Sequence, residues 1–192
     1  EYKGVVFNEM KGALTSPSTR LNEALNSALF PNLTYGINSG GDPKHIPELT
    51  YEELCNFHQT YYHPSRCLFF FYGNLPLEKH LDFIERQTLK DTVAVPPLPP
   101  LPLQPRFSEP RHLIHDYPIA AEEDMTNKTI IAFGWLTCHI LEQQELLALT
   151  VLEIALLDTD ASPVKMASLK SGLCKQVSCY TEEDISEIPL VI

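Results

Sequence analysis

Histidine is the residue of this chain with the widest potential for metal chemistry, and seven are present. A catalytic zinc ion is usually held by three protein ligands and keeps one position for water. His58 and His63 are five positions apart, and the proline after His63 is expected to end the intervening helix, so the two rings would not share a helix face. His45 and Glu48 begin the inverted zinc motif H-x-x-E-H, but Leu49 replaces its second histidine. The sequence therefore encodes no complete metal site.

Nucleophilic and phosphate-binding patterns are also incomplete. The chain has no G-x-S-x-G elbow, and no serine or cysteine stands in a context that marks it as activated. Residues 39–43 (Ser-Gly-Gly-Asp-Pro) could point backbone amides at an anion, but the Lys-Ser/Thr continuation of a phosphate loop is missing. A structural loop is the better interpretation of this turn. The five cysteines are odd in number and contain no C-x-x-C pair, which favours a reduced compartment over a disulfide scaffold.

One carboxylate stands at an unusual place in the apolar pattern. Val5, Val6 and Ala13 recur at helical spacing and predict a helix over about residues 2–13, with Glu9 on its apolar side. A carboxylate is costly to bury unless a cation or a hydrogen-bond donor meets it. From the residue pattern alone, a lone helical glutamate is more typical of a solvated surface than of a binding site.

The elements ahead of residue 90 are mostly helical. Apolar residues at helical spacing predict three further helices, over residues 17–29, 51–62 and 76–89. The clearest helix start is Thr50 with Glu53 three residues later, the pattern of a capping box. Residues 67–72 (Cys-Leu-Phe-Phe-Phe-Tyr) are an uninterrupted apolar run, which predicts a strand buried on both faces.

A proline-rich stretch divides the chain. Residues 95–105 hold prolines that fix an extended backbone, which indicates a stiff linker. A ligand for a proline-recognition domain is the alternative, but only leucine and proline lie between Pro97 and Pro100, and no arginine stands close by. We therefore expect an α+β unit over residues 1–90, a linker over 91–111 and a second unit over 112–192.

The second unit is expected to alternate strands with helices. The predicted strands cover residues 112–117, 128–137, 176–181 and 188–192. Between the second and third of them we expect a strongly apolar helix over 141–157 and a short helix over 162–171 that ends at Gly172. Both halves thus mix strands with helices, and the predicted fold class is α+β with two-layer sandwich units.

Charge narrows the classes of partner. The chain holds 14 Lys and Arg against 25 Asp and Glu, a formal charge of −11. Nucleic acid and anionic membranes are therefore poor partners, whereas a basic ligand would be attracted. The sequence has no apolar run long enough to span a membrane, and no basic region followed by an apolar one opens it. It begins inside an expected helix, so we expect an internal piece of a longer protein. Any targeting peptide would lie upstream of this expected internal piece.

Seven tracts, in the order of the chain, share one resemblance: residues 4–12 (GVVFNEMKG), 34–36 (TYG), 39–43 (SGGDP), 46–50 (IPELT), 57–65 (FHQTYYHPS), 156–163 (LLDTDASP) and 171–173 (SGL). Together they resemble the presequence-protease and falcilysin branch of the insulinase (pitrilysin) zinc metallopeptidases. Because the tracts are collinear over most of the chain, they are more specific than any single motif.

The resemblance implies a large zinc peptidase of two homologous halves that enclose a chamber. In that family an H-x-x-E-H helix supplies two histidines and the general-base glutamate, and a later helix supplies a third ligand, a glutamate. Glu9 occupies this later position, so the resemblance makes it a Zn²⁺ ligand. The H-x-x-E-H motif would lie upstream of Glu1. We therefore expect that the present chain alone, with at most one of three ligands, neither holds catalytic zinc tightly nor cleaves peptides.

The resemblance also implies a substrate class and leaves several points open. The branch typically degrades short unstructured peptides, including basic presequences, so we expect peptide substrates and the remainder of the parent chain as partners, without nucleic acid or membrane. Arg66 stands where an asparagine is common, and Asp158 and Asp160 replace the usual glycine and proline. The alternative is a catalytically inactive structural or partner subunit of the same family. The expected compartment is a bacterial cytoplasm, with a mitochondrial or other organelle matrix as the alternative.

Overall fold

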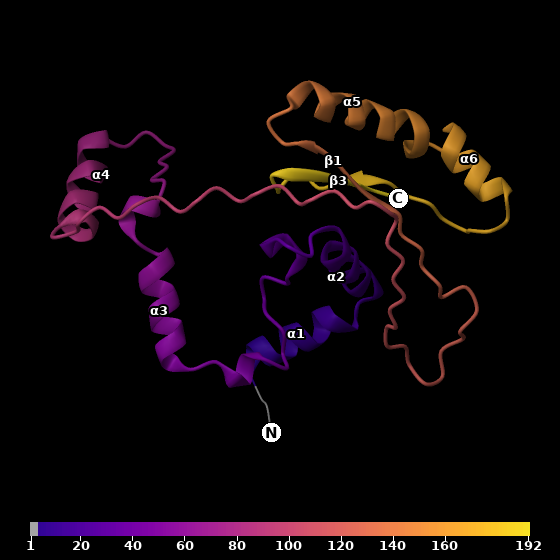
Figure 1. Ribbon diagram of the computed structural model, residues 1–192, viewed down its shortest axis with the longest axis horizontal. Helices are drawn as coiled ribbons and strands as arrows, with labels where there is room; N and C mark the ends of the chain where they lie inside the picture. Colours follow the sequence, from indigo (N-terminus) through magenta and orange to yellow (C-terminus); the bar gives the residue numbers. More distant parts are fainter. Residues whose placement is uncertain (1–3) are drawn as a thin grey trace. The chain divides into compact units, whose positions relative to one another are not determined.

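The computed structural model describes residues 4–192 and combines helices with one small sheet (Figure 1). The predicted α+β class is confirmed. The helices and strands, in chain order, are α1 (Val5–Thr15), α2 (Pro17–Leu29), α3 (Tyr51–Tyr61), α4 (Leu77–Ile84), β1 (Gly134–His139), α5 (Gln143–Glu153), α6 (Pro163–Lys170), β2 (Tyr180–Thr181) and β3 (Glu187–Val191). Both α4 and α5 continue in one wider, π-helical turn, over Glu85–Leu89 and Ile154–Asp158.

The chain forms two compact units. Unit 1 comprises Glu1–Pro43 and Pro102–Ile192, and unit 2 comprises Lys44–Leu101. The sequence predicts a first unit over residues 1–90, a linker over 91–111 and a second unit over 112–192. These boundaries stay a prediction.

The sheet of unit 1 is antiparallel in the order β1-β3-β2. Trp135 of β1 and Thr181 of β2 both pair with Leu190 of the central strand β3. Phe133 and Ile192 extend the β1–β3 pairing with two reciprocal backbone hydrogen bonds of 2.8 and 2.9 Å. The central strand is therefore the most buried part of the sheet.

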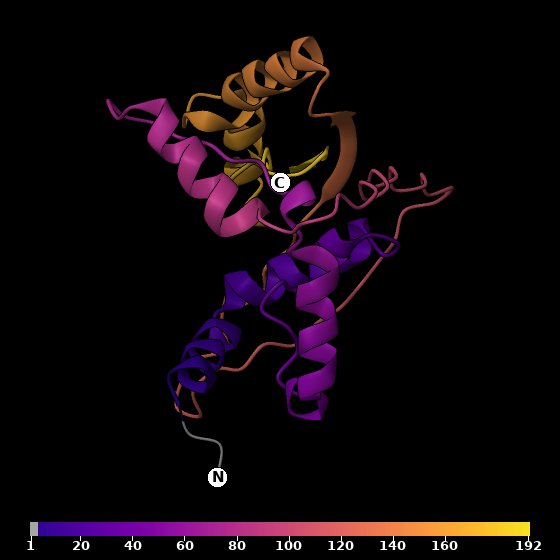
Figure 2. The ribbon, with the colours of Figure 1, turned by 90° about the vertical axis from the view of Figure 1, so that its left-hand side faces the viewer.

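The core of unit 1 lies between α2 and the sheet. Leu29, Phe30 and Leu33 are buried together, and Leu136 of β1 packs against them. A Cβ atom at Gly134 would lie 3.0 Å from methyl groups of α2, so a glycine here lets the helix approach the strand closely. Helices α5 and α6 lie on the other side of the sheet (Figures 1 and 2).

The predicted helices are confirmed within the described residues, and residues 2 and 3 of the first prediction lie outside them. Local capping explains where several of the helices begin. The Ser16 side chain accepts a hydrogen bond from the backbone N–H of Thr19 at the start of α2. Thr50 and Glu53 form the expected capping box at the start of α3. Gly172 follows α6 with a φ of 72°, a left-handed conformation typical of a helix end.

Two of the predicted strands are wrong. Residues 67–72 and 112–117 form no strand, and the first of these segments is exposed rather than buried on both faces. A strand needs a hydrogen-bonded neighbour, and within residues 4–192 the only sheet is the one made of β1, β3 and β2. The predicted strand over 128–137 is also shifted, because β1 begins at Gly134 and ends at His139.

Candidate functional site

Glu9, the predicted metal ligand, lies in the second turn of α1 and is exposed to solvent. Val5 precedes it by four residues and therefore shares its helix face. Val5 and Val6 are 73% and 68% exposed, and no described residue of α1 is buried. The carboxylate thus stands on an apolar helix face that nothing covers within the described part of the chain.

The metal-ligating side chains of the chain are dispersed. Among residues 4–192, no three His, Cys, Asp or Glu side chains gather where they could hold a metal ion. Glu9 can contribute one carboxylate oxygen donor, which falls short of the three protein ligands of a catalytic zinc site. The described residues therefore do not fit a zinc ion by themselves, and other ligands would have to come from outside them.

The histidines considered as ligands have other contacts. His45 and Glu48 lie 3.1 Å apart, but both side chains are 72% exposed. His58 stacks on Tyr62 with 5.0 Å between ring centroids. His63 accepts a hydrogen bond from the backbone N–H of Ser65 and starts a short 3-10 turn. These histidines thus organise local turns and ring contacts at the surface of unit 2.

A buried polar network at the end of the linker was not predicted from the sequence. Gln104 is 3% exposed; its side chain donates to Oδ1 of Asn32 at 2.9 Å and accepts from the Asn32 backbone N–H at 3.1 Å. Its own backbone N–H donates to the Glu187 carboxylate at 3.0 Å, and Arg106 pairs with that carboxylate at 2.7 Å. The end of the linker is therefore fixed to β3 and to the end of α2, which makes this network structural.

A second group of titratable residues lies near the end of α5 and includes Glu153 and Cys179. Burial, followed by the negative charges of Glu183 and Asp158, raises the pKa of Glu153 above its ordinary value. Burial and the nearby Glu153 also raise the pKa of the Cys179 thiol. A thiol with a raised pKa is a poor nucleophile, so this corner of unit 1 does not favour cysteine chemistry.

A cavity of about 430 Å³ lies between the α1–α2 corner and the loop over residues 117–128. The Tyr117 hydroxyl donates to the backbone oxygen of Lys128, and Lys128 pairs with Glu123. The hydrogen bond between the two side chains lowers the pKa of Glu123 and raises the pKa of Lys128. The residues that line the cavity include no nucleophile with an adjacent base, so the cavity does not favour acyl-transfer chemistry.

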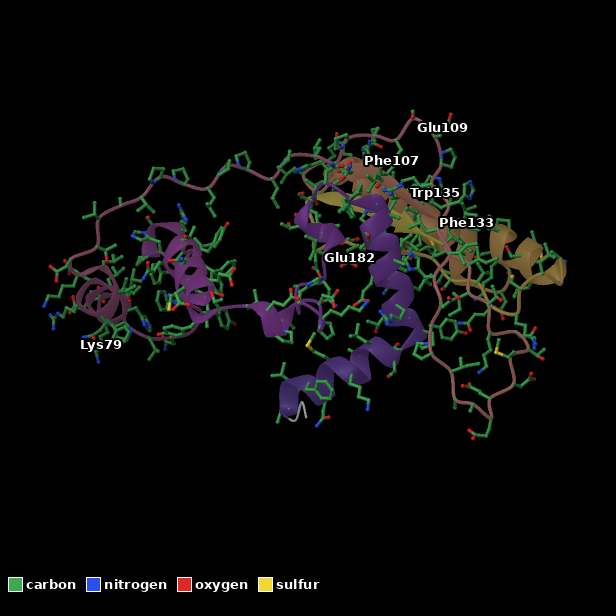
Figure 3. All side chains as sticks on the ribbon, turned by 60° about the horizontal axis from the view of Figure 1, so that its bottom comes forward. Lys79, Phe107, Glu109, Phe133, Trp135 and Glu182 are labelled. Atoms are coloured by element: carbon green, nitrogen blue, oxygen red, sulfur yellow. The ribbon has the colours of Figure 1, made fainter. Side chains whose placement is uncertain are left out.

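Exposed aromatic rings mark one face of β1 (Figure 3). Phe133 and Trp135 stack with 6.3 Å between ring centroids, and they are 59% and 48% exposed. Because side chains alternate along a strand, they point away from the face that packs on α2. Phe107 lies nearby under the Arg111 guanidinium, 5.2 Å from its ring centroid. This surface can contact apolar or cationic groups, but it holds no group for bond breaking.

The three residues that depart from the family pattern have defined contacts. Arg66 donates to the backbone oxygens of Thr60 and Pro96, and so joins the end of α3 to the start of the linker. Asp160 pairs with Lys165 at 3.1 Å, and the same lysine donates to the backbone oxygen of Asp158 at 3.3 Å. The substitutions are therefore accommodated by contacts within the same units.

A protein-family model matches most of the chain. The family model described as "Peptidase M16 inactive domain" matches residues 48–187, a range that does not include Glu9. No helix within the described residues is both long and apolar enough to cross a membrane.

Three relatives illustrate the likeness. The chain is 41% identical over 180 residues to "Presequence protease 1, chloroplastic/mitochondrial" of Arabidopsis thaliana, covering 90% of this chain and 16% of that protein. It is 37% identical over 177 residues to "Presequence protease, mitochondrial" of Xenopus laevis, covering 90% and 17%. It is also 37% identical over 178 residues to "Protein HypA" of Clostridium perfringens, covering 93% and 18%. The chain thus spans less than a fifth of the length of these relatives.

Proposed function

Because the chain belongs to the peptidase M16 family, we propose that it is part of a zinc metalloendopeptidase that degrades short unstructured peptides of the presequence type. The observation that carries this proposal is the identity of 37–41% over about nine-tenths of the chain to proteins that include two presequence proteases. The seven collinear tracts of the sequence support the same family branch. Since the relatives are several times longer, the activity belongs to a longer parent protein.

The contribution of this chain to zinc binding is one ligand, Glu9. Its place on a bare apolar helix face supports this role, because such a face is normally covered by other protein and a covered carboxylate needs a cation or donor. The remaining ligands and the general base come from an H-x-x-E-H motif upstream. A bound zinc ion would supply Lewis-acid and water-activating chemistry. The part of this chain is to hold the Glu9 carboxylate on a rigid helix.

Substrate preference follows from charge. The formal charge of −11 attracts basic peptides, and presequences of the expected type are basic. The names of the plant and frog relatives place those proteins in mitochondria or chloroplasts, which supports an organelle matrix as the compartment. The clostridial relative keeps the bacterial cytoplasm as the alternative.

A second function has one observation in its favour. The family model that matches residues 48–187 describes an inactive domain. A catalytically inactive structural or partner subunit would match it equally well. The two functions differ upstream of Glu1, because only the active enzyme needs an H-x-x-E-H motif there.

The test compares the parent protein with the 192-residue chain. Both are given a basic, unstructured peptide and zinc, with and without a chelator. We expect chelator-sensitive cleavage by the parent and none by the chain, which supplies at most one ligand. Chelator-sensitive turnover by the chain alone would refute the assignment of the other ligands to the upstream region. A parent with no activity and no H-x-x-E-H motif would establish the structural alternative instead.

A further inference from the structure

The linker contains residues 96–101 (Pro-Pro-Leu-Pro-Pro-Leu), a doubled triplet that we call the PPL segment. Each of its residues is a proline or directly precedes one, since Pro102 follows Leu101. The proline ring fixes φ at about −65°, and a residue before proline is restricted to an extended backbone. The segment therefore favours the polyproline II helix, in which six residues span about 19 Å.

The triplet repeat sorts the side chains of the PPL segment by type. Because this helix has about three residues a turn, side chains three positions apart share a face. Two faces therefore carry only prolines, and the third carries Leu98 and Leu101. Proline ridges of this kind are what aromatic-lined grooves bind in proline-recognition domains.

The PPL segment is open to solvent. All six of its residues are exposed, and Figure 1 shows an extended trace there without helix or strand. Among residues 4–192, the one hydrogen bond to the segment comes from Arg66, which donates to the Pro96 backbone oxygen at 3.4 Å. The backbone oxygens of residues 97–101 thus have no donor within the described chain, and they can accept hydrogen bonds from a partner.

The start of the PPL segment is held in place within unit 2. The backbone N–H of Val95 donates to the Ser65 hydroxyl at 3.2 Å, next to the contact between Arg66 and Pro96. A ligand that is already extended and held at one end loses little conformational freedom when it is bound. The segment is therefore preorganised for binding.

We propose that the PPL segment is a docking site for a partner domain of the WW type, whose groove is lined by aromatic rings. Charge decides between the kinds of groove, because no charged residue stands between Asp91 and Arg106. A groove that pairs an acidic side chain with an arginine of its ligand finds no counterpart in this segment. A neutral aromatic groove needs none, since it recognises the extended backbone and the proline rings. The missing arginine thus selects the kind of partner.

The test is the binding of a fluorescently labelled WW domain that recognises proline–leucine motifs, measured by fluorescence anisotropy. The domain is titrated with the 192-residue chain and with the parent protein, and we expect saturable binding to both. The double variant Pro97→Ala, Pro100→Ala should bind about tenfold more weakly or less, because it loses two rings and two fixed φ angles. The control is Pro43→Ala, Pro110→Ala, which replaces two exposed prolines outside the segment and should leave the affinity unchanged.

Several results would overturn the proposal. No binding to the chain, or equal affinities of the two double variants, would show that the PPL segment is not the ligand. Binding to the chain but not to the parent would show that other parts of the parent cover the segment. Self-association of the chain that Pro97→Ala, Pro100→Ala abolishes would assign the segment to a second copy. These measurements use neither zinc nor peptide cleavage, so a failure here is distinguishable from a failure of the proposed function.

Discussion

Replacing Arg106 is expected to leave the buried Glu187 carboxylate without its cation. This carboxylate anchors the end of the linker to the sheet. The Glu187 side chain is 1% exposed, and Arg106 pairs with it at 2.7 Å while remaining 55% exposed. Loss of one partner of a buried pair costs about 3–5 kcal/mol, because the other charge stays buried without compensation. Here the backbone N–H of Gln104 still donates to the carboxylate, and the half-exposed guanidinium is partly screened. We therefore expect Arg106→Ala to lower the free energy of unfolding by about 2–3 kcal/mol.

A second substitution separates the charge from the packing. In the double variant Arg106→Ala, Glu187→Gln, the neutral side chain still accepts the hydrogen bond of the Gln104 backbone N–H but carries no unpaired charge. The double variant should therefore recover about 1 kcal/mol or more of the lost stability. As a control, Arg86→Ala removes an exposed pair with Asp82 and should cost less than about 0.5 kcal/mol. Urea unfolding followed by circular dichroism gives all four free energies.

Two outcomes would refute this reasoning. Arg106→Ala could be as harmless as Arg86→Ala, which would mean that the Glu187 carboxylate is satisfied without its cation. Alternatively, Glu187→Gln could add to the loss of Arg106→Ala instead of relieving it. The second result would show that packing around Glu187, and not its charge, stabilises the linker contact.

Three further predictions concern unit 1. Gly36→Ala should destabilise the chain by about 1–3 kcal/mol in urea unfolding, because its Cβ would overlap the backbone oxygen of Phe30, whereas Gly12→Ala has open space and should not. Burial raises the pKa of Glu153 above its ordinary 4.5, so its contribution to stability is full below pH 4.5 and is lost as pH rises through the raised value. Glu153→Gln should remove this fall in the free energy of unfolding, and an unchanged pH profile would contradict the assignment. Burial also raises the pKa of Cys179, so iodoacetamide at pH 8 should label it more slowly than the exposed Cys67; equal rates by peptide mass spectrometry would count against this.

The helices of this chain could be predicted because their signals are local. Ser16 and Thr50 bond to backbone groups three residues away, and these caps operate whatever the rest of the fold does. The turn after α6 is equally local, since Gly172 alone supplies the left-handed conformation. Sequence pattern therefore locates these elements to within a few residues.

The strands and the linker contact depend on distant residues, and sequence pattern could not locate them. The apolar run over residues 67–72 predicted a strand buried on both faces, but the segment is exposed and pairs with no strand of the described chain. Gln104 meets Asn32 and Glu187 across separations of 72 and 83 residues, and no spacing rule connects them. A polar residue at the end of an apolar, proline-rich stretch was the only available signal.

The same distinction applies to the candidate site. The family resemblance singled out Glu9, and the apolar pattern around it predicted the helix that carries it. Val5 and Val6 on that helix are exposed within the described chain, so the structure shows no group that meets the carboxylate. Local sequence could therefore predict the helix, whereas the role of Glu9 as a zinc ligand stays a prediction.

The central claim is that Glu9 binds zinc in the parent protein, and metal content tests it most directly. Zinc is measured after dialysis in the parent, in Glu9→Gln and in Glu52→Gln, a control at another exposed helical glutamate. We expect equimolar zinc in the parent and the control. In Glu9→Gln we expect an affinity loss beyond the roughly 10–100-fold that removal of an outer-shell partner causes. A Glu9→Gln protein that retains equimolar zinc and full peptidase activity would contradict the claim.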